Sequence, residues 1–189
     1  MARPLTASDE EILDVAQDIL VREGLSGFSI SAVARRIGLS RTAISLRFQN
    51  IDNLRRVTME RMSRGFEEKL TALDIQPGGE GLLAVADVVG GHIRSREGFS
   101  GYMARTSLGS PDAGERGKHL QRGNALRQAI ARAMPDTEVE HSIAVDMFLS
   151  HIAGSLLQWR EAQNISPREF LRERTLIWLR LTHIPIKAE

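Results

Sequence analysis

The sequence predicts an all-α protein of about nine helices, with a small N-terminal helical domain and a larger helical domain behind it. Apolar residues recur at spacings of three and four along most of the chain, and no segment shows the sustained alternation of a β-strand. Glycine and proline clusters separate the periodic segments, most clearly at 75–79. We therefore expect a three-helix domain over 1–50 and a helical domain over 51–189.

The first helix is expected to begin after Ser8, because Ser8 and Glu11 have the spacing of a capping box. Gly24 is expected to end it, because glycine readily adopts the backbone conformation that closes helices. The apolar positions between these ends share one helical face: Ile12, Val15, Ala16, Ile19 and Leu20.

Two short helices joined by a tight turn should follow. Ser29 can cap the first, and Ser40 can cap the second, which spans Arg41 to Phe48. Gly38 lies in the turn between them. The inward positions are Val33, Ala34 and Ile37 in the first helix, and Ile44 and Phe48 in the second. A short helix, a glycine-containing turn and a second short helix form the plan of a helix-turn-helix unit.

The rest of the chain is expected to form longer helices. The predicted spans are 51–73, 80–95, 101–108, 113–134, a long helix from the Thr137–Glu140 capping box to about 163, and a last helix from 167 to about 182. The last start is well marked, since Ser166, Pro167 and Glu169 supply an N-cap, a first-turn proline and a capping carboxylate.

The charge distribution favours a nucleic-acid partner more than the net charge of +1 does. Acidic residues crowd 9–23, whereas 24–51 has none and carries Arg35, Arg36, Arg41 and Arg47. The absence of cysteine excludes disulfides and thiolate metal sites. The first residues lack a signal-like apolar core, and the longest apolar stretch, 82–93, is too short to cross a bilayer, so we expect a soluble cytoplasmic protein.

The second short helix has the side chains to enter the major groove of DNA, which is wide enough for a helix. Its candidate contacts are Arg41, Thr42, Ala43, Ser45 and Arg47, with Ser31 at the start of the preceding helix. Arg41 can bind guanine or phosphate, and Thr42 and Ala43 can meet thymine methyl groups. Ser31, Ser45 and Arg47 suit phosphates, which position the protein without reading sequence.

Four segments then form a recognisable pattern: Ile12-Leu13-x-x-Ala16, Gly24-x-x-x-Phe28-Ser29, Val33-Ala34-x-x-Ile37-Gly38-Leu39-Ser40 and Ile44-x-x-x-Phe48. This pattern, over about a third of the chain, resembles the N-terminal signature of the TetR (tetracycline-repressor) family. The resemblance implies a ligand-responsive transcriptional regulator, by family habit a repressor. It also implies a homodimer on a palindromic operator, with recognition helices about 34–36 Å apart.

Two departures from the family pattern bear on DNA affinity. Ser45 stands where the family usually has tyrosine, and Ile51 stands where it commonly has lysine. Both usual residues contact the DNA backbone, and phosphate contacts dominate affinity. We therefore expect weaker or more salt-sensitive docking than is typical of the family.

The resemblance implies that the C-terminal helices bind an effector and form the dimer. The helix ending near 163 is apolar almost all round, which indicates burial in a core or against a partner. The dimerisation candidates are Ser150, Ala153, Gly154, Leu157, Ile177, Trp178 and Leu181. The effector candidates, which favour a small apolar or aromatic ligand, are Phe66, His92, Phe99, Tyr102, Met103, Met147 and His151. The alternative is that these residues simply form the core.

Other classes of protein stay open. Residues 29–48 could be a plain helical bundle, and the changes at Ser45 and Ile51 would fit an interaction adaptor with a degenerate DNA-binding unit. Glu138 and His141 have the Glu-x-x-His spacing of helical di-iron enzymes, but a second such motif is missing. His-Glu-x-x-His, Gly-x-Ser-x-Gly and phosphate-loop motifs are also missing, so no catalytic, cofactor or metal site is expected.

Overall fold

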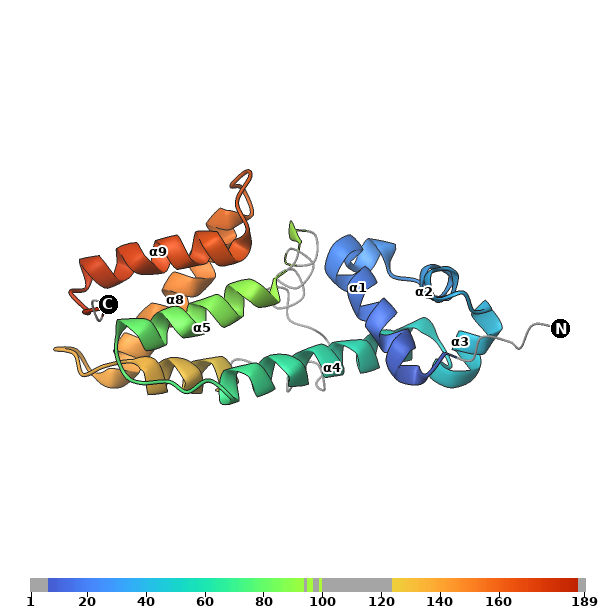
Figure 1. Cartoon of the computed structure of the whole chain (residues 1–189), viewed down its shortest axis with the longest axis horizontal. Coiled ribbons are helices and arrows are strands. Elements are labelled where there is room, and N and C mark those ends of the chain that lie inside the picture. Colours follow the sequence, from blue (N-terminus) through green and yellow to red (C-terminus); the bar gives the residue numbers. More distant parts are fainter. Residues whose placement is uncertain (1–6, 94, 97–98, 100–123, 187–189) are drawn as a thin grey trace. The chain divides into compact units, whose positions relative to one another are not determined.

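The computed structural model describes residues 7–93, 95–96, 99 and 124–186 of the chain, and its regular elements in these ranges are all helices (Figure 1). They are α1 (Asp9–Gly27), α2 (Ile30–Ile37), α3 (Arg41–Phe48), α4 (Ile51–Thr71), α5 (Gly79–His92), α8 (His141–Trp159) and α9 (Pro167–Leu181), together with a helical segment at 124–133. The all-α prediction is confirmed. The helix expected at 101–108 and the first part of that expected at 113–134 lie outside the described residues.

The chain divides into two compact units, each with its own core. The first comprises the described parts of Met1–Gly65 and Arg94–Arg105, and the second those of Phe66–Ile93 and Thr106–Glu189. The division falls inside α4, after Gly65, so this helix contributes to both units.

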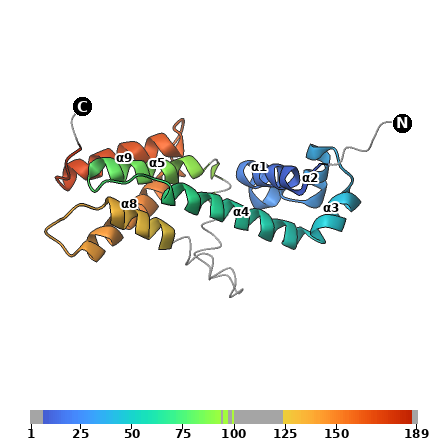
Figure 2. The same cartoon turned by 60° about the horizontal axis from the view of Figure 1, so that its bottom comes forward.

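Unit 1 packs α1, α2, α3 and the part of α4 up to Gly65 around one apolar core (Figure 2). Its side chains include the predicted inward residues Ile12, Ala16, Ile19, Val33, Ala34, Ile44 and Phe48, together with Leu54 of α4. Arg61 on α4 adds an ionic link to α1, with its Nη2 2.7 Å from Asp14 Oδ1 and 3.2 Å from Glu10 Oε2. Each of these amphipathic helices therefore buries its apolar face against the other helices of unit 1.

The ends of α1 follow from local chemistry. The Ser8 hydroxyl accepts from the Glu11 N–H at 3.2 Å, and the Glu11 carboxylate accepts from the Ser8 N–H at 2.7 Å. Gly24 has a positive φ of 68°, which glycine adopts readily, but its ψ of −163° lies outside the left-handed conformation that closes helices. The chain makes one further turn beyond it, however, so the element extends to Gly27 across a kink at Gly24.

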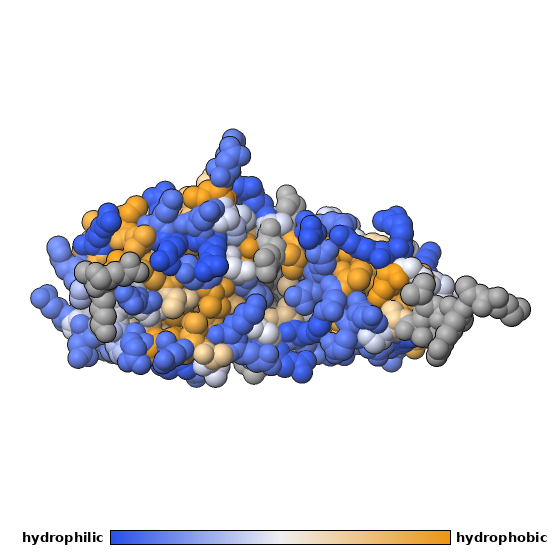
Figure 3. Space-filling view, in the orientation of Figure 1, coloured by the Kyte–Doolittle hydropathy of each residue, from blue (hydrophilic) through white to orange (hydrophobic). Residues whose placement is uncertain are grey.

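Unit 2 is built from α5, α8, α9 and the segment 124–133, with α9 lying along α5 and α8 (Figure 1). Its core includes Leu82, Val85, Ile130, Phe148, Leu171 and Leu179. Asp87 on α5 pairs with Arg172 on α9, Oδ2 to Nη1 at 2.7 Å. Apolar side chains also reach the surface of this unit, seen in orange in Figure 3. Some of its helices therefore carry apolar groups that the described residues leave exposed.

The start of α8 corrects one prediction. The capping box expected at Thr137–Glu140 is wrong, because α8 begins at His141 and no side chain caps it. Thr137 instead donates its hydroxyl proton to the Val139 carbonyl at 3.0 Å, so it supports a bend before the helix. The helix also ends at Trp159, earlier than expected.

The start of α9 confirms its prediction. Pro167 opens the helix, and Ser166 and Glu169 form a reciprocal capping box. Hydrogen bonds that the Ser166 hydroxyl and backbone N–H donate to its carboxylate lower the pKa of Glu169.

Candidate nucleic-acid interface and ligand region

The α3 helix is anchored on one side and open on the other. Ile44 and Phe48 are buried in the core of unit 1, and the Ser40 hydroxyl accepts from the Ala43 N–H at 3.0 Å to cap the helix. The preceding turn closes through Gly38, whose φ of 76° and ψ of 23° lie in the left-handed region. These restraints fix both the start and the rotation of α3, and so decide which of its side chains project.

The predicted DNA contacts are not equally presented. Arg41 and Thr42 are exposed, while Ala43 and Ser45 are half-buried. Arg47 reaches back to the start of α1, where its guanidinium donates to the Ala7 carbonyl and lies 3.5 Å from Asp9 Oδ1. Arg41 and Thr42 are therefore accessible to a groove of DNA, whereas Arg47 lies beside a carboxylate that would compete with a DNA phosphate.

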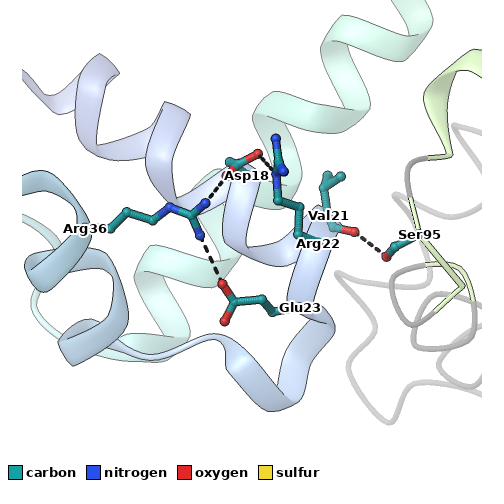
Figure 4. A network of polar contacts seen from close by, with 6 residues as sticks. All are labelled: Asp18, Val21, Arg22, Glu23, Arg36 and Ser95. Carbon is teal, nitrogen blue, oxygen red and sulfur yellow. Dashed lines mark hydrogen bonds and ion pairs between the residues drawn. The ribbon is translucent and has the colours of Figure 1, made fainter.

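Arg36 also forms ion pairs with acidic residues of α1 (Figure 4). Its Nη2 lies 2.9 Å from Asp18 Oδ2, and its Nη1 lies 3.0 Å from Glu23 Oε1. Arg35 and Arg41 are exposed and form no ion pair with any described residue. Two of the four arginines in the acid-free window are thus partly neutralised by the acidic first helix, which the charge count along the chain did not reveal.

The start of α4 shows the surroundings of Ile51, where the resemblance led us to expect a lysine. Asn50 accepts from the Asn53 N–H through its Oδ1 at 2.9 Å and so acts as the N-cap. The side chain of Ile51 is half-buried and packs against the core of unit 1. At this position the chain has an apolar packing residue in place of a cation. Ser31, the remaining phosphate candidate, is exposed in the first turn of α2.

Sequence reasoning missed Leu46, which is 81% exposed on α3. A helical projection would have found it, because two residues after the buried Ile44 correspond to about 200° around a helix. On α3, the predicted DNA contacts included only the polar and small residues and omitted Leu46.

The effector candidates divide into separate groups. Phe66 of α4 and His92 of α5 stack at 4.7 Å between ring centroids, with a tilt of 43°, and both are half-buried. Phe99 is buried, and it belongs to the part of the chain grouped with unit 1. Tyr102 and Met103 lie outside the described residues. The structure therefore brings Phe66 and His92 together.

Met147 and His151 of α8 have other surroundings. Met147 is 59% exposed. His151 lies 5.7 Å from the rings of both Phe148 and Trp178, and its Nε2 is 3.5 Å from the Thr175 hydroxyl. Burial, aided by Arg174, lowers the pKa of His151. His151 thus belongs to an aromatic cluster between α8 and α9.

Most dimerisation candidates lie at the surface. Ser150, Ala153, Leu157, Ile177 and Leu181 are exposed, and Gly154 is half-exposed. A Cβ at Gly154 would meet no atom within 4 Å. Trp178 is different, because it is half-buried against Phe148, at 4.9 Å and nearly perpendicular.

Two general features of the described residues concern other classes of protein. No group of three or more histidine, aspartate or glutamate side chains in the described ranges is arranged to hold a metal ion. None of the described helices combines the length and the apolar character needed to cross a membrane.

Comparison with known proteins identifies the N-terminal segment. Residues 12–57 match the family of bacterial regulatory proteins described as the tetR family. These residues run from the first buried position of α1 into α4, and so contain the whole of α2, the turn and α3. The sequence has no significant match to a curated protein.

Three solved structures share the fold at low sequence identity. A transcriptional regulator from Rhodococcus sp. Rha1 has a TM-score of 0.74 and 17% identity, covering 96% of this chain and 100% of that one. FadR from Bacillus subtilis, in complex with stearoyl-CoA, has a TM-score of 0.60 and 14% identity, covering 90% and 97%. The multidrug binding protein EbrR, complexed with imidazole, has a TM-score of 0.54 and 20% identity, covering 95% and 96%.

The family match spans the helix-turn-helix, and the likeness in fold extends over nearly the whole chain. Residues 12–57 therefore match the tetR family, and the chain shares its fold with the three solved structures.

Proposed function

We propose that the protein is a ligand-responsive repressor that binds a palindromic operator as a homodimer and is released by a small apolar or aromatic effector. The observation that carries the proposal is the outward face of α3. This face projects from a capped helix anchored by Ile44 and Phe48, and it presents Arg41 and Thr42 to solvent. No acidic residue occurs between 24 and 51, and Arg41 forms no ion pair with any described residue, so this arginine is available to a polyanion.

The exposed apolar side of α8 supports a dimer. Ile143, Met147, Ser150, Gly154 and Leu157 follow each other at spacings of four and three, which is the 3.5-residue period of a helix–helix seam. We call these five residues the α8 seam. Its centre is small, so a partner helix can approach closely, and its ends are apolar. On α9, Ile177 and Leu181 repeat the i, i+4 pattern with 47% and 74% exposure.

The Phe66–His92 pair supports an effector site within unit 2. Aromatic surface with a polar ring edge is typical of sites for small molecules. FadR was solved in complex with stearoyl-CoA, and the multidrug binding protein EbrR in complex with imidazole, so both proteins of this fold bind small molecules. Ser95, three residues after His92, donates a hydrogen bond to the Val21 carbonyl of α1 (Figure 4). The chain from His92 to Ser95 therefore connects the Phe66–His92 pair to a residue that is bonded to α1.

Release requires that the effector prefer the state that does not bind DNA, with a coupling of about 1–3 kcal/mol in typical cases. The DNA-binding part of the proposal is tested by selecting bound duplexes from a random pool with the full chain. We expect an inverted repeat whose half-sites lie about one helical turn apart. Recovery of no enriched sequence would contradict the repressor and favour a protein-interaction adaptor.

The selected duplex then allows the effector to be tested. Stearoyl-CoA and tetraphenylphosphonium are suitable probes, one with a long acyl chain and one an aromatic cation. We expect at least one of them to lower DNA affinity about fivefold or more, in line with that coupling. Binding of a probe without any change in DNA affinity would contradict the regulatory link.

The dimer is tested by placing charges in the α8 seam. Met147→Glu and Leu157→Glu should convert a dimer to a monomer in sedimentation velocity at micromolar concentration, because each buries a carboxylate in an apolar contact. Ala72→Glu adds the same charge at an exposed site after α4, and should leave the dimer intact. A wild-type chain that sediments as a monomer would contradict the proposal directly.

A further inference from the structure

Leu46 is the most exposed large apolar side chain in the described part of the protein. Single exposed leucines are common on protein surfaces, so exposure alone carries little information. The position of Leu46 carries more. It lies about 200° around α3 from the buried Ile44, and one helical turn after the exposed Thr42. Leu46 and Thr42 therefore form the centre of the face that is directed away from the core.

The charges near this face indicate which kind of molecule binds to it. Arg41 is exposed at the start of the same helix, and acidic residues are absent from 24–51. An apolar surface of a protein partner could cover Leu46, but it would leave Arg41 without a counter-charge. Duplex DNA supplies phosphates for the cation and, in the major groove, one apolar group for the leucine. That group is the 5-methyl group of thymine.

We infer that Leu46 reads a thymine in each half-site by packing its side chain against the thymine methyl group. This inference rests on the proposed DNA-binding function and specifies one contact within it. The contact adds sequence specificity that phosphate contacts cannot give, because adenine, guanine and cytosine present no methyl group in the groove. It also gives a physical role to an exposed leucine that stability does not require.

The test replaces single thymines of the selected duplex by deoxyuridine, which removes the methyl group and leaves every base-pair hydrogen bond in place. For the wild-type chain, we expect one sensitive thymine in each half-site. Its replacement in a single half-site should weaken binding about fourfold, the value for burial of one methyl-sized group. Substitution in both half-sites should weaken it about fifteenfold. Leu46→Ala should weaken binding to the thymine duplex and lose the dependence on the methyl group at that position.

Two further variants make the comparison specific. Leu46→Met keeps a long apolar side chain and should keep most of the dependence on the methyl group. Thr42→Ser removes the methyl group of the neighbouring outward residue and keeps its hydroxyl, so the position linked to Leu46 should still respond to deoxyuridine. Since Leu46 is exposed and alanine favours helices, Leu46→Ala should melt at the wild-type temperature.

The outcomes separate this inference from the proposed function. Failure of the wild-type chain to bind any selected duplex would overturn DNA binding itself, and this inference with it. Tight binding with the same deoxyuridine profile in the wild type and in Leu46→Ala would overturn the leucine contact alone. A loss of affinity in Leu46→Ala that is equal for every duplex would assign Leu46 to the sugar–phosphate backbone, and would also overturn the inference.

Discussion

Two adjacent glycines of α5 give a matched pair of substitutions with opposite expected signs. A Cβ at Gly90 would lie 2.6 Å from the Arg168 Cα and 3.0 Å from the Pro167 carbonyl oxygen, both backbone atoms at the start of α9. They cannot turn aside as a side chain can, so α9 itself must move. A Cβ at Gly91 would meet no heavy atom within 4 Å.

The magnitudes follow from these distances. Overpacking of this kind costs about 1–3 kcal/mol, so we expect Gly90→Ala to lower the free energy of unfolding by about that amount. Gly91→Ala should raise it by about 0.5–1 kcal/mol, because alanine loses less backbone entropy in a helix than glycine does. In a chain of this length each kcal/mol shifts the melting temperature by about 2–4 °C. The two variants should therefore melt on opposite sides of the wild type.

The assay is thermal and urea unfolding of the full chain, followed by circular dichroism, for the wild type and the two variants under the same conditions. Equal stabilisation by both alanines would refute the reasoning, since it would mean that α5 and α9 do not approach closely at Gly90. Destabilisation by Gly91→Ala would refute it as well, because that position would then be covered.

Two other predictions concern charge. Asp9→Asn removes the carboxylate beside Arg47, and should raise DNA affinity about twofold to fivefold at low salt, with a smaller gain as salt is added. Asp74→Asn makes the same charge change at an exposed site and should leave DNA affinity unchanged. An equal gain in both variants would contradict the role of Arg47. Burial, aided by Arg174, lowers the pKa of His151, so the unfolded chain binds more protons and the free energy of unfolding should fall as the pH drops from about 7.5 to about 5.5. His151→Gln should flatten that slope in urea titrations, and an unchanged slope would show that another group causes it.

Features that depend on neighbouring residues could be predicted from the sequence. The bounds of α3 and the capping boxes at Ser8 and Ser166 were predicted correctly, because an N-cap hydroxyl and an apolar stripe are decided within one or two helical turns. The failed box at Thr137 shows the limit of this argument. The same hydroxyl had a competing local bond to Val139, and the sequence pattern alone does not rank the two.

Features that depend on contacts between distant residues could not be predicted. Arg47 meets Asp9, 38 residues earlier, and Arg36 meets Glu23, 13 residues earlier. Both pairings arise from the packing of α1 against the other helices of unit 1, and they change which arginines remain open to a ligand. The exposure of Met147 likewise depends on which side of α8 the rest of unit 2 covers.

The central claim is that the outward face of α3 enters the major groove at two places on one duplex. Methylation interference on the selected duplex tests it most directly, because dimethyl sulfate methylates guanine N7 in the major groove and adenine N3 in the minor groove. We predict interference at guanines in two clusters about one helical turn apart, with none at adenines between them. Interference confined to adenine N3, or to a single cluster, would contradict the account.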